Sequence, residues 1–325
     1  MKIFKMDQVK THSFWNKDID PVAYLDSEDE IIVETKDSSD GQIDLNSDSQ
    51  SLLKMDFSRV NPSTGPFYIN GAKKGDTLKI EILEIENKGW GWTGIIPGFG
   101  LFAGDTTFYQ EELAGPSLKI WKSDKKYSKA KFGDIDIEII NEPFIGTIGV
   151  APLNKGTFSI IPPREHGGNM DQKFLGPGST LYLPVFNDGA LLSFGDIHLA
   201  QGDGEVCGTA IEAPATVKLK ISVIKDTMQG GPYFSFKKVN NYNEYLAFSG
   251  FSNNLMDATK IAVMRMINTF SNFIEPQEAY MLASVALDLK ISEIVDIPNF
   301  NVTGVIPLDI IKDKEIREKL KTLVK

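Results

Sequence analysis

Cysteine, histidine and long apolar runs are scarce in this chain of 325 residues. It has one cysteine, Cys207, and three histidines. A single thiol permits no disulfide within the chain, which fits a reducing compartment. No segment approaches the roughly 20 consecutive apolar residues of a membrane helix, and residues 1–15 lack the apolar core of a signal peptide. We therefore expect a soluble, cytoplasmic protein without a membrane partner.

The chain also has fewer basic than acidic residues. Lys and Arg number 34 against 44 Asp and Glu, which gives a formal net charge of −10. No run rich in Lys and Arg and no basic stripe interleaved with aromatics offsets this balance. An extended phosphate-binding surface is disfavoured, so we expect no nucleic-acid partner.

Several familiar catalytic signatures are missing. The chain has no G-x-S-x-G elbow, no Walker P-loop and no H-E-x-x-H helix. Gly98-Phe99-Gly100 begins like a dinucleotide-binding motif but lacks the third glycine at the right place. We therefore expect neither a nucleotide nor an organic cofactor.

Apolar periodicity predicts a mainly β protein with an α+β tail. Residues 78–85 and 216–224 alternate apolar and polar side chains, as half-buried strands do. Other short apolar runs recur between Gly- and Pro-rich turns, a spacing that suits a sandwich or barrel. Asn187-Asp188-Gly189 is predicted to close a hairpin between strands at 181–186 and 190–194.

After Gly250 the spacing becomes helical. A helix is predicted from Met256 to Phe273, with Asn253 or Asn254 as its N-terminal cap. Pro276 suits the first turn of a second helix reaching about Leu289. Residues 291–302 then return to a strand pattern.

The length suggests about two domains. We predict a β-rich catalytic region over 1–250, with site loops at 164–205, and an α+β region over 251–325 packed on it.

Two features leave alternatives open. Residues 37–51 are rich in Asp, Ser, Gly, Asn and Gln and are predicted to form a loop. Glu34 and Asp37, where a strand enters this loop, are interpreted as a solvated strand end in preference to catalytic acids. The segments Gly89-Trp90-Gly91-Trp92 and Pro97-Gly98-Phe99-Gly100 either line a pocket with aromatic walls or, the more common case, pack in a core.

The segment from Arg164 to Glu205 concentrates the groups that could carry chemistry. It contains two of the three histidines and many glycines. Near its start, His166 is followed by Gly167, Gly168 and Asn169, and then by Asp171. Glycines in so polar a loop let the backbone approach another group closely.

Asp196 and His198 are two residues apart, so on a strand both side chains point to one face. An imidazole and a carboxylate could bind a divalent metal, or the carboxylate could orient a general-base histidine. Gln201, Asp203 and Glu205 continue the spacing, and the glycines between them would let Glu205 approach His198. The alternative is a glycine-rich hairpin whose acids face water.

Four motifs together resemble those of a known family. They are NPSTGPFYINGAKKGD at 61–76, HGGNMD at 166–171, GDIH at 195–198 and QGDGE at 201–205. In order and spacing they resemble the acetamidase/formamidase family, and the likeness runs along nearly the whole chain. The resemblance implies hydrolysis of short aliphatic amides to a carboxylate and ammonia. It also implies a jelly-roll-like β-sandwich with a smaller α+β part, in a homo-oligomer.

Amide hydrolysis needs a nucleophile, oxyanion stabilisation and a proton for the leaving ammonia. We therefore assign three sets of site residues, with zinc or calcium as the expected metal if one is bound. The catalytic candidates are Glu205, Asp171, His198 and Asp196; the substrate-binding candidates are Gly167, Gly168, Asn169 and Gln201; the metal-ligand candidates are His166, Asp171, Asp196 and His198. The alternatives are a β-sandwich that binds a small ligand without turning it over, or a hydrolase of a different small amide.

Overall fold

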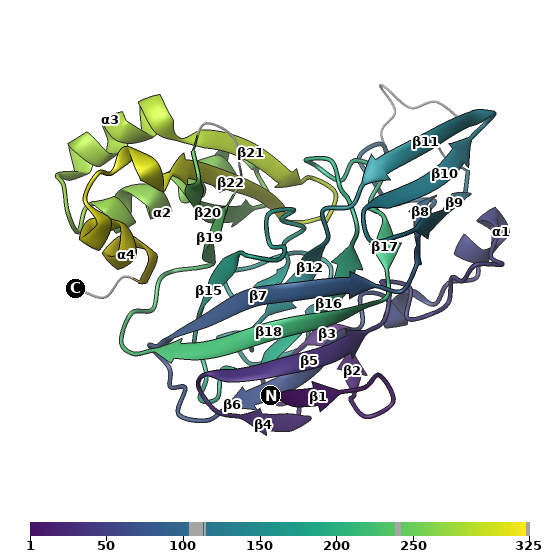
Figure 1. Ribbon diagram of the computed structural model, residues 1–325, viewed down its shortest axis with the longest axis horizontal. Helices are drawn as coiled ribbons and strands as arrows, with labels where there is room; N and C mark the ends of the chain where they lie inside the picture. The colour runs from purple at the N-terminus through teal and green to yellow at the C-terminus, as the bar shows by residue number, and fades with distance from the viewer. Residues whose placement is uncertain (104–112, 114, 238–241, 323–325) are drawn as a thin grey trace.

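Two large β-sheets packed face to face form the body of the protein (Figure 1). The computed structural model describes residues 1–103, 113, 115–237 and 242–322. The first sheet has nine strands in the order β1 (Lys2–Phe4), β5 (Asp29–Thr35), β18 (Ala215–Ile224), β7 (Thr77–Asn87), β15 (Thr180–Pro184), β19 (Tyr233–Lys237), β20 (Glu244–Ser252), β22 (Phe300–Pro307) and β21 (Asp288–Glu293).

The second sheet has eleven strands and carries most of the polar central segment. Its main path is β11 (Ile135–Ile140), β10 (Tyr127–Phe132), β9 (Ser117–Ser123), β8 (Trp90–Ile95), β17 (Glu212–Ala213), β16 (Leu192–His198), β12 (Phe144–Gly149) and β14 (Gly167–Asn169). β6 (Ser63–Ile69) pairs with β16 and with β2 (Thr11–His12) and β4 (Ala23–Leu25), while β3 (Phe14–Trp15) and β13 (Phe158–Ser159) form a separate pair.

The main core lies between the two sheets. Val33 and Leu219 of the first sheet and Phe67 and Phe194 of the second are fully buried in one apolar cluster. Burying such a side chain contributes roughly 1.5–3 kcal/mol each. The predicted alternation in β18 is confirmed, because its intervening Lys218 forms an ion pair with a glutamate on the neighbouring strand instead of entering the core.

Helices cluster at the C-terminal end (Figure 1). They are α2 (Leu255–Phe270), α3 (Pro276–Ala286) and α4 (Lys314–Thr322), and a short α1 (Ser49–Leu52) lies apart from them. Asn254 caps α2, as predicted, through its side-chain oxygen. A mainly β sandwich with C-terminal helices is confirmed. Within the described residues, no helix is both long and apolar enough to cross a membrane.

The predicted boundary at residue 250 falls inside a strand. β20 spans it and pairs with β19 on one side and β22 on the other, so the first sheet continues into the C-terminal region. A second apolar cluster lies between these strands and the helices. The division into two regions stays a prediction.

The hairpin predicted at Asn187–Gly189 is wrong. β15 pairs with β7 and β19 in the first sheet, whereas β16 belongs to the second sheet. Gly189, Ala190 and Leu191 all have positive φ angles, which carry the chain from one sheet to the other instead of back along the same one.

The C-terminal strand prediction also needs correction. Residues 291–302 are not one strand, because β21 ends at Glu293 and β22 begins at Phe300. Pro298 cannot donate a ladder hydrogen bond, and the connection carries Asp296 toward the polar centre of the molecule. The second helix ends at Ala286, short of Leu289, because the edge strand β21 starts at Asp288.

Asp37 is not part of a solvated strand end. It is buried, and its carboxylate accepts hydrogen bonds from the backbone N–H groups of Ser39 and Gly41 and from Trp92 Nε1. Glu34 remains partly exposed and pairs with Lys88. The polar segment after β5 is therefore packed into the protein at its start.

Candidate active site

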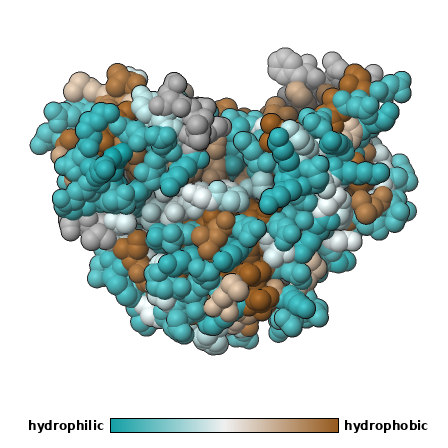
Figure 2. Space-filling view, viewed as in Figure 1, coloured by the Kyte–Doolittle hydropathy of each residue, from teal (hydrophilic) through white to brown (hydrophobic). Residues whose placement is uncertain are grey.

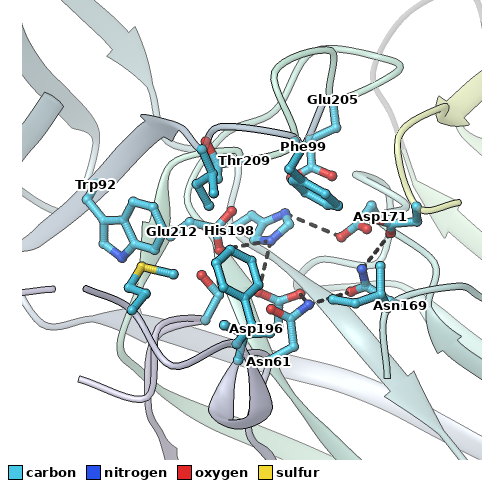
Figure 3. Close-up of a pocket in the computed structure, with 18 residues that line it drawn as sticks. Asn61, Trp92, Phe99, Asn169, Asp171, Asp196, His198, Glu205, Thr209 and Glu212 are labelled. Carbon is cyan, nitrogen blue, oxygen red and sulfur yellow. Dashed lines mark hydrogen bonds and ion pairs between the residues drawn. The ribbon is translucent and has the colours of Figure 1, made fainter. Parts of the chain in front are cut away.

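A cavity of about 160 Å³ opens among the polar loops of the second sheet (Figure 3). One part of its lining is acidic and another is apolar. The lining residues are Ser38, Met55, Phe57, Val60, Asn61, Trp92, Ile96, Phe99, Ile161, Asn169, Asp171, Asp196, His198, Glu205, Gly208, Thr209, Glu212 and Asp296. Trp92 and Phe99 thus line a pocket, which was the less favoured of their two interpretations.

Asp196 and His198 come together at the end of β16. Asp196 Oδ1 lies 3.2 Å from His198 Nε2, while Ile197 between them is fully buried in the core. Asp196 has a positive φ of 57°, so the strand is distorted at this residue. The opposing residue is Gly146, where an added Cβ would lie 2.7 Å from Asp171 Oδ1 and 2.9 Å from His198 Cε1. A glycine at 146 is what leaves room for the two groups.

Gln201 orients the imidazole of His198. Its Nε2 donates to the backbone oxygens of Asp171 (3.0 Å) and Ser292 (3.2 Å), so its Oε1 must face His198 Nδ1 at 2.9 Å. Nδ1 is therefore protonated, and its N–H group donates a hydrogen bond to Gln201 Oε1. Gln201 lies behind the histidine instead of lining the cavity.

The other nitrogen of His198 faces two carboxylates. Asp196 Oδ1 and Glu212 Oε2 each lie 3.2 Å from Nε2. Burial lowers the pKa of His198, but Glu212 and Asp196 outweigh burial and raise it well above its ordinary value. Figure 3 shows the ring between this pair and Asp171, whose Oδ1 is 3.7 Å from Nδ1.

Asp196 is the best-satisfied acid of the group. Its Oδ2 accepts hydrogen bonds from Asn61 Nδ2 at 3.1 Å and from Thr147 Oγ1 at 3.0 Å. Burial alone would raise the pKa of Asp196, but the charge of His198 and hydrogen bonds with His198, Glu212 and Thr147 lower it. Asp196 is therefore ionised.

The other acids of the cavity are pushed toward the protonated form. Burial raises the pKa of Asp171 to about 6 and that of Glu212 to about 7. Burial, with the added charge of neighbouring carboxylates, raises the pKa of Glu205 and Asp296 well above their ordinary values. Behind them, burial raises the pKa of Glu293 to about 8.

Sequence reasoning missed Glu212, Asp296 and the contact made by Asn61. Glu212 stands alone in the apolar run from Ala210 to Ala215, and an acid in such a run needs a partner if it is buried, which was the available signal. Pairing of β16 with β17 sets Glu212 directly beside His198. Asp296 carried the same signal, since it lies between Val295 and Ile297 in the sequence.

Asn169 is the one member of the His166–Asn169 stretch that reaches the cavity. Its Nδ2 donates to Asp296 Oδ2 at 2.6 Å, and its Oδ1 accepts from Asn61 Nδ2 and shares the single hydroxyl hydrogen of Thr147 with Asp196. His166 does not line the cavity. Its ring packs edge-on against Trp15 with 4.9 Å between centroids, and burial lowers its pKa to about 3.

Gly167 and Gly168 are also outside the cavity lining. Both belong to β14, which pairs with β12, and a Cβ on Gly167 would lie 2.5 Å from Ile148 O. The Gly167 N–H already donates to Arg164 O, so it is not free to stabilise an oxyanion. These glycines allow close strand packing.

Fold and cavity together define a class of two-sheet β proteins with buried carboxylates gathered around one histidine. Within it, the model of the acetamidase/formamidase family matches residues 1–155 and 153–313. The chain therefore belongs to the acetamidase/formamidase family, and the predicted family is confirmed.

Individual relatives agree with this placement. The chain is 27% identical to the formamidase of Methylophilus methylotrophus over 368 residues, which cover 92% of this chain and 89% of the relative. It is 29% identical to the acetamidase of Mycolicibacterium smegmatis over 329 residues, or 79% and 80% of the two chains. The crystal structure of the acetamidase from Bacillus halodurans matches with a TM-score of 0.83 and 33% identity, covering 96% of this chain and 99% of that one.

Proposed function

We propose that this protein is an amidase that hydrolyses short aliphatic amides to a carboxylate and ammonia in the cavity around His198. The observation that carries the proposal is the set of buried acids around one imidazole, with pKa values driven apart, in a member of this family. Groups whose pKa values are separated by their surroundings can serve as acid and base in one reaction.

Asp171 and Glu205 supply the proton transfers in this proposal. Asp171, with a pKa of about 6, is largely ionised at neutral pH and accepts the proton of the attacking water. The water oxygen bonds to the amide carbon. Glu205, whose raised pKa keeps it protonated, donates its proton to the nitrogen as the C–N bond breaks, so ammonia leaves. Both residues belong to one buried group with His198.

A divalent cation fits the same cavity. Asp196, His198 and Glu212 offer one ligand atom each, all within 4.8 Å of one another, as do Asp171, His198 and Glu205. Apart from the carboxyl group of Asp296, no group of the described residues donates a hydrogen bond to either oxygen of Asp171. Buried anionic oxygens without donors are costly unless a proton or cation compensates them.

We favour the set Asp196, His198 and Glu212 as ligands. Gln201 holds a proton on Nδ1, so Nε2, which faces the two carboxylates, is the nitrogen that would bind a cation after losing its own proton, as is typical of a metal-binding histidine. His166 is left out of this set because it lies outside the cavity. A zinc ion bound there would polarise the amide carbonyl and lower the pKa of a bound water.

Glu205→Gln tests the general acid. The side-chain amide keeps the shape of the protonated carboxyl but cannot transfer its proton, so kcat should fall by roughly 10²–10⁴-fold. The thermal midpoint should change little. Asp203→Asn, in the same loop but ion-paired with Lys173 at the surface, is the matched control and should retain its rate. Ammonia release from acetamide near the wild-type rate by the Glu205 variant would refute this assignment.

Glu212→Gln tests the metal set. Losing the charge of one of the two carboxylate ligands should lower cation affinity by at least roughly 10–100-fold, the effect seen even for outer-shell partners. Elemental analysis after dialysis against a chelator measures this directly. Asp76→Asn, a buried acid paired with Lys225 outside the cavity, controls for the loss of a buried carboxylate. A wild-type protein that is fully active without metal contradicts the metal part and leaves the amidase proposal standing.

We also propose a homo-oligomer assembled through α3 and the edge strand β21. Tyr280, Met281 and Val285 of α3 are 65%, 63% and 81% exposed, and Leu289 of β21 is 51% exposed. Figure 2 shows apolar side chains at the end of the molecule where α3 lies. Exposed apolar patches commonly mark contact surfaces. A location in the cytoplasm stays a prediction.

The solution molar mass tests this surface. The wild-type protein should have a molar mass in solution that is a multiple of 36.0 kDa. Met281→Glu combined with Val285→Glu should dissociate the oligomer, because the interface would bury two charges without partners. A wild-type monomer at micromolar and higher concentrations would disprove the assembly.

A further inference from the structure

The apolar wall of the cavity has no part in the proton transfers described above. Figure 3 shows Trp92 on the opposite side of His198 from Asp171 and Asn169. The apolar lining consists of Met55, Phe57, Val60, Trp92, Ile96, Phe99 and Ile161. All of these except Phe57 also belong to a hydrophobic cluster that is separate from the core between the sheets.

This wall is fixed in place from behind. Trp92 Nε1 donates to the buried Asp37 carboxylate at 3.0 Å, and Ile43 and Leu52 complete the cluster out of contact with solvent. Phe99 packs against Gly208, where an added Cβ would lie 2.3 Å from the Phe99 ring. Because these contacts hold its side chains in place, the wall is a preformed surface and does not collapse around a small ligand.

The volume exceeds what the smallest amides occupy. A cavity of roughly 150 Å³ lined by apolar side chains binds benzene, with six non-hydrogen atoms. The cavity here is about 160 Å³. Formamide has three such atoms, acetamide four and butyramide six, so formamide and acetamide would leave the apolar wall uncovered.

We propose that this wall is an acyl-chain subsite and that the enzyme prefers propionamide and butyramide over acetamide. This inference rests on the proposed amidase function. The amide group lies at the acids around His198, and the alkyl chain lies against Ile96 and Val60. A carboxylate at the end of the chain is rejected, since no lysine or arginine lies among the described residues that line the cavity.

A series of linear amides tests the subsite in the intact enzyme. From acetamide to propionamide to butyramide, kcat/KM should rise by roughly fourfold per methylene, the ratio that corresponds to about 0.8 kcal/mol. Succinamate, which replaces the butyramide methyl with a carboxylate, should react far more slowly. A steady fall from acetamide to butyramide would overturn the subsite but leave the amidase proposal intact. No ammonia from any amide would instead refute the amidase proposal.

Substitutions at two isoleucines of the same cluster distinguish a role of the wall in substrate binding from a role in packing alone. Ile96 lines the cavity, whereas Ile120 packs on the cluster without lining it. Ile96→Ala should lower the butyramide-to-acetamide ratio of kcat/KM severalfold, and Ile120→Ala should leave that ratio unchanged. Ile161→Ala, at a half-buried lining position, provides a second variant if Ile96→Ala does not fold. An unchanged ratio in the lining variants, or an equal change in Ile120→Ala, would overturn the assignment.

Discussion

The structure depends on the free-energy cost of gathering carboxylates out of water. The described residues that line one cavity include five buried acids and one buried imidazole, with Glu293 behind them, and an isolated ionised carboxylate in such surroundings is very unfavourable. For Asp196, the interaction with His198 and hydrogen bonds from Asn61 and Thr147 offset this cost. The remaining acids reduce this cost because their raised pKa values favour the uncharged form. A bound cation would compensate the negative charge of those that are ionised. The strain of this arrangement is what prepares the groups for proton transfer.

The two-sheet fold keeps these like charges together. Asp196 and His198 are on β16, Glu212 is on the paired strand β17, and Asp171 follows β14, which pairs through β12 to the same sheet. Because the core between the sheets fixes these strands, repulsion cannot be relieved by moving the acids apart. The apolar cluster behind Trp92 closes the other side of the cavity.

Local sequence patterns predicted what depends on local structure. Period-two spacing predicted that Asp196 and His198 share a face, and the alternation in β18 and the cap at Asn254 were equally local. Glu212 reached the site through strand pairing. Asp296 reached it through a connection between two C-terminal strands, and no spacing rule reports either event.

The misplaced candidates have the same physical origin. His166 is five residues from Asp171, but tight packing of β14 on β12 turns its ring toward Trp15 and away from the cavity. The glycines beside it were correctly seen as sites of close approach, although the partner is a neighbouring strand instead of a substrate. Composition indicated a polar loop after β5, but only the folded chain shows that Asp37 supports the wall of the cavity through Trp92.

A double-mutant cycle on Asp196 and His198 tests most directly whether the buried cluster acts as one catalytic unit. kcat/KM for a short amide would be measured for the wild type, Asp196→Asn, His198→Gln and the double variant, each confirmed to be folded. If both groups serve one metal or one proton network, either single change should cost nearly as much as both together. Strict additivity of the two barrier changes would contradict the account, because it would mean that the two side chains act independently although their atoms are 3.2 Å apart.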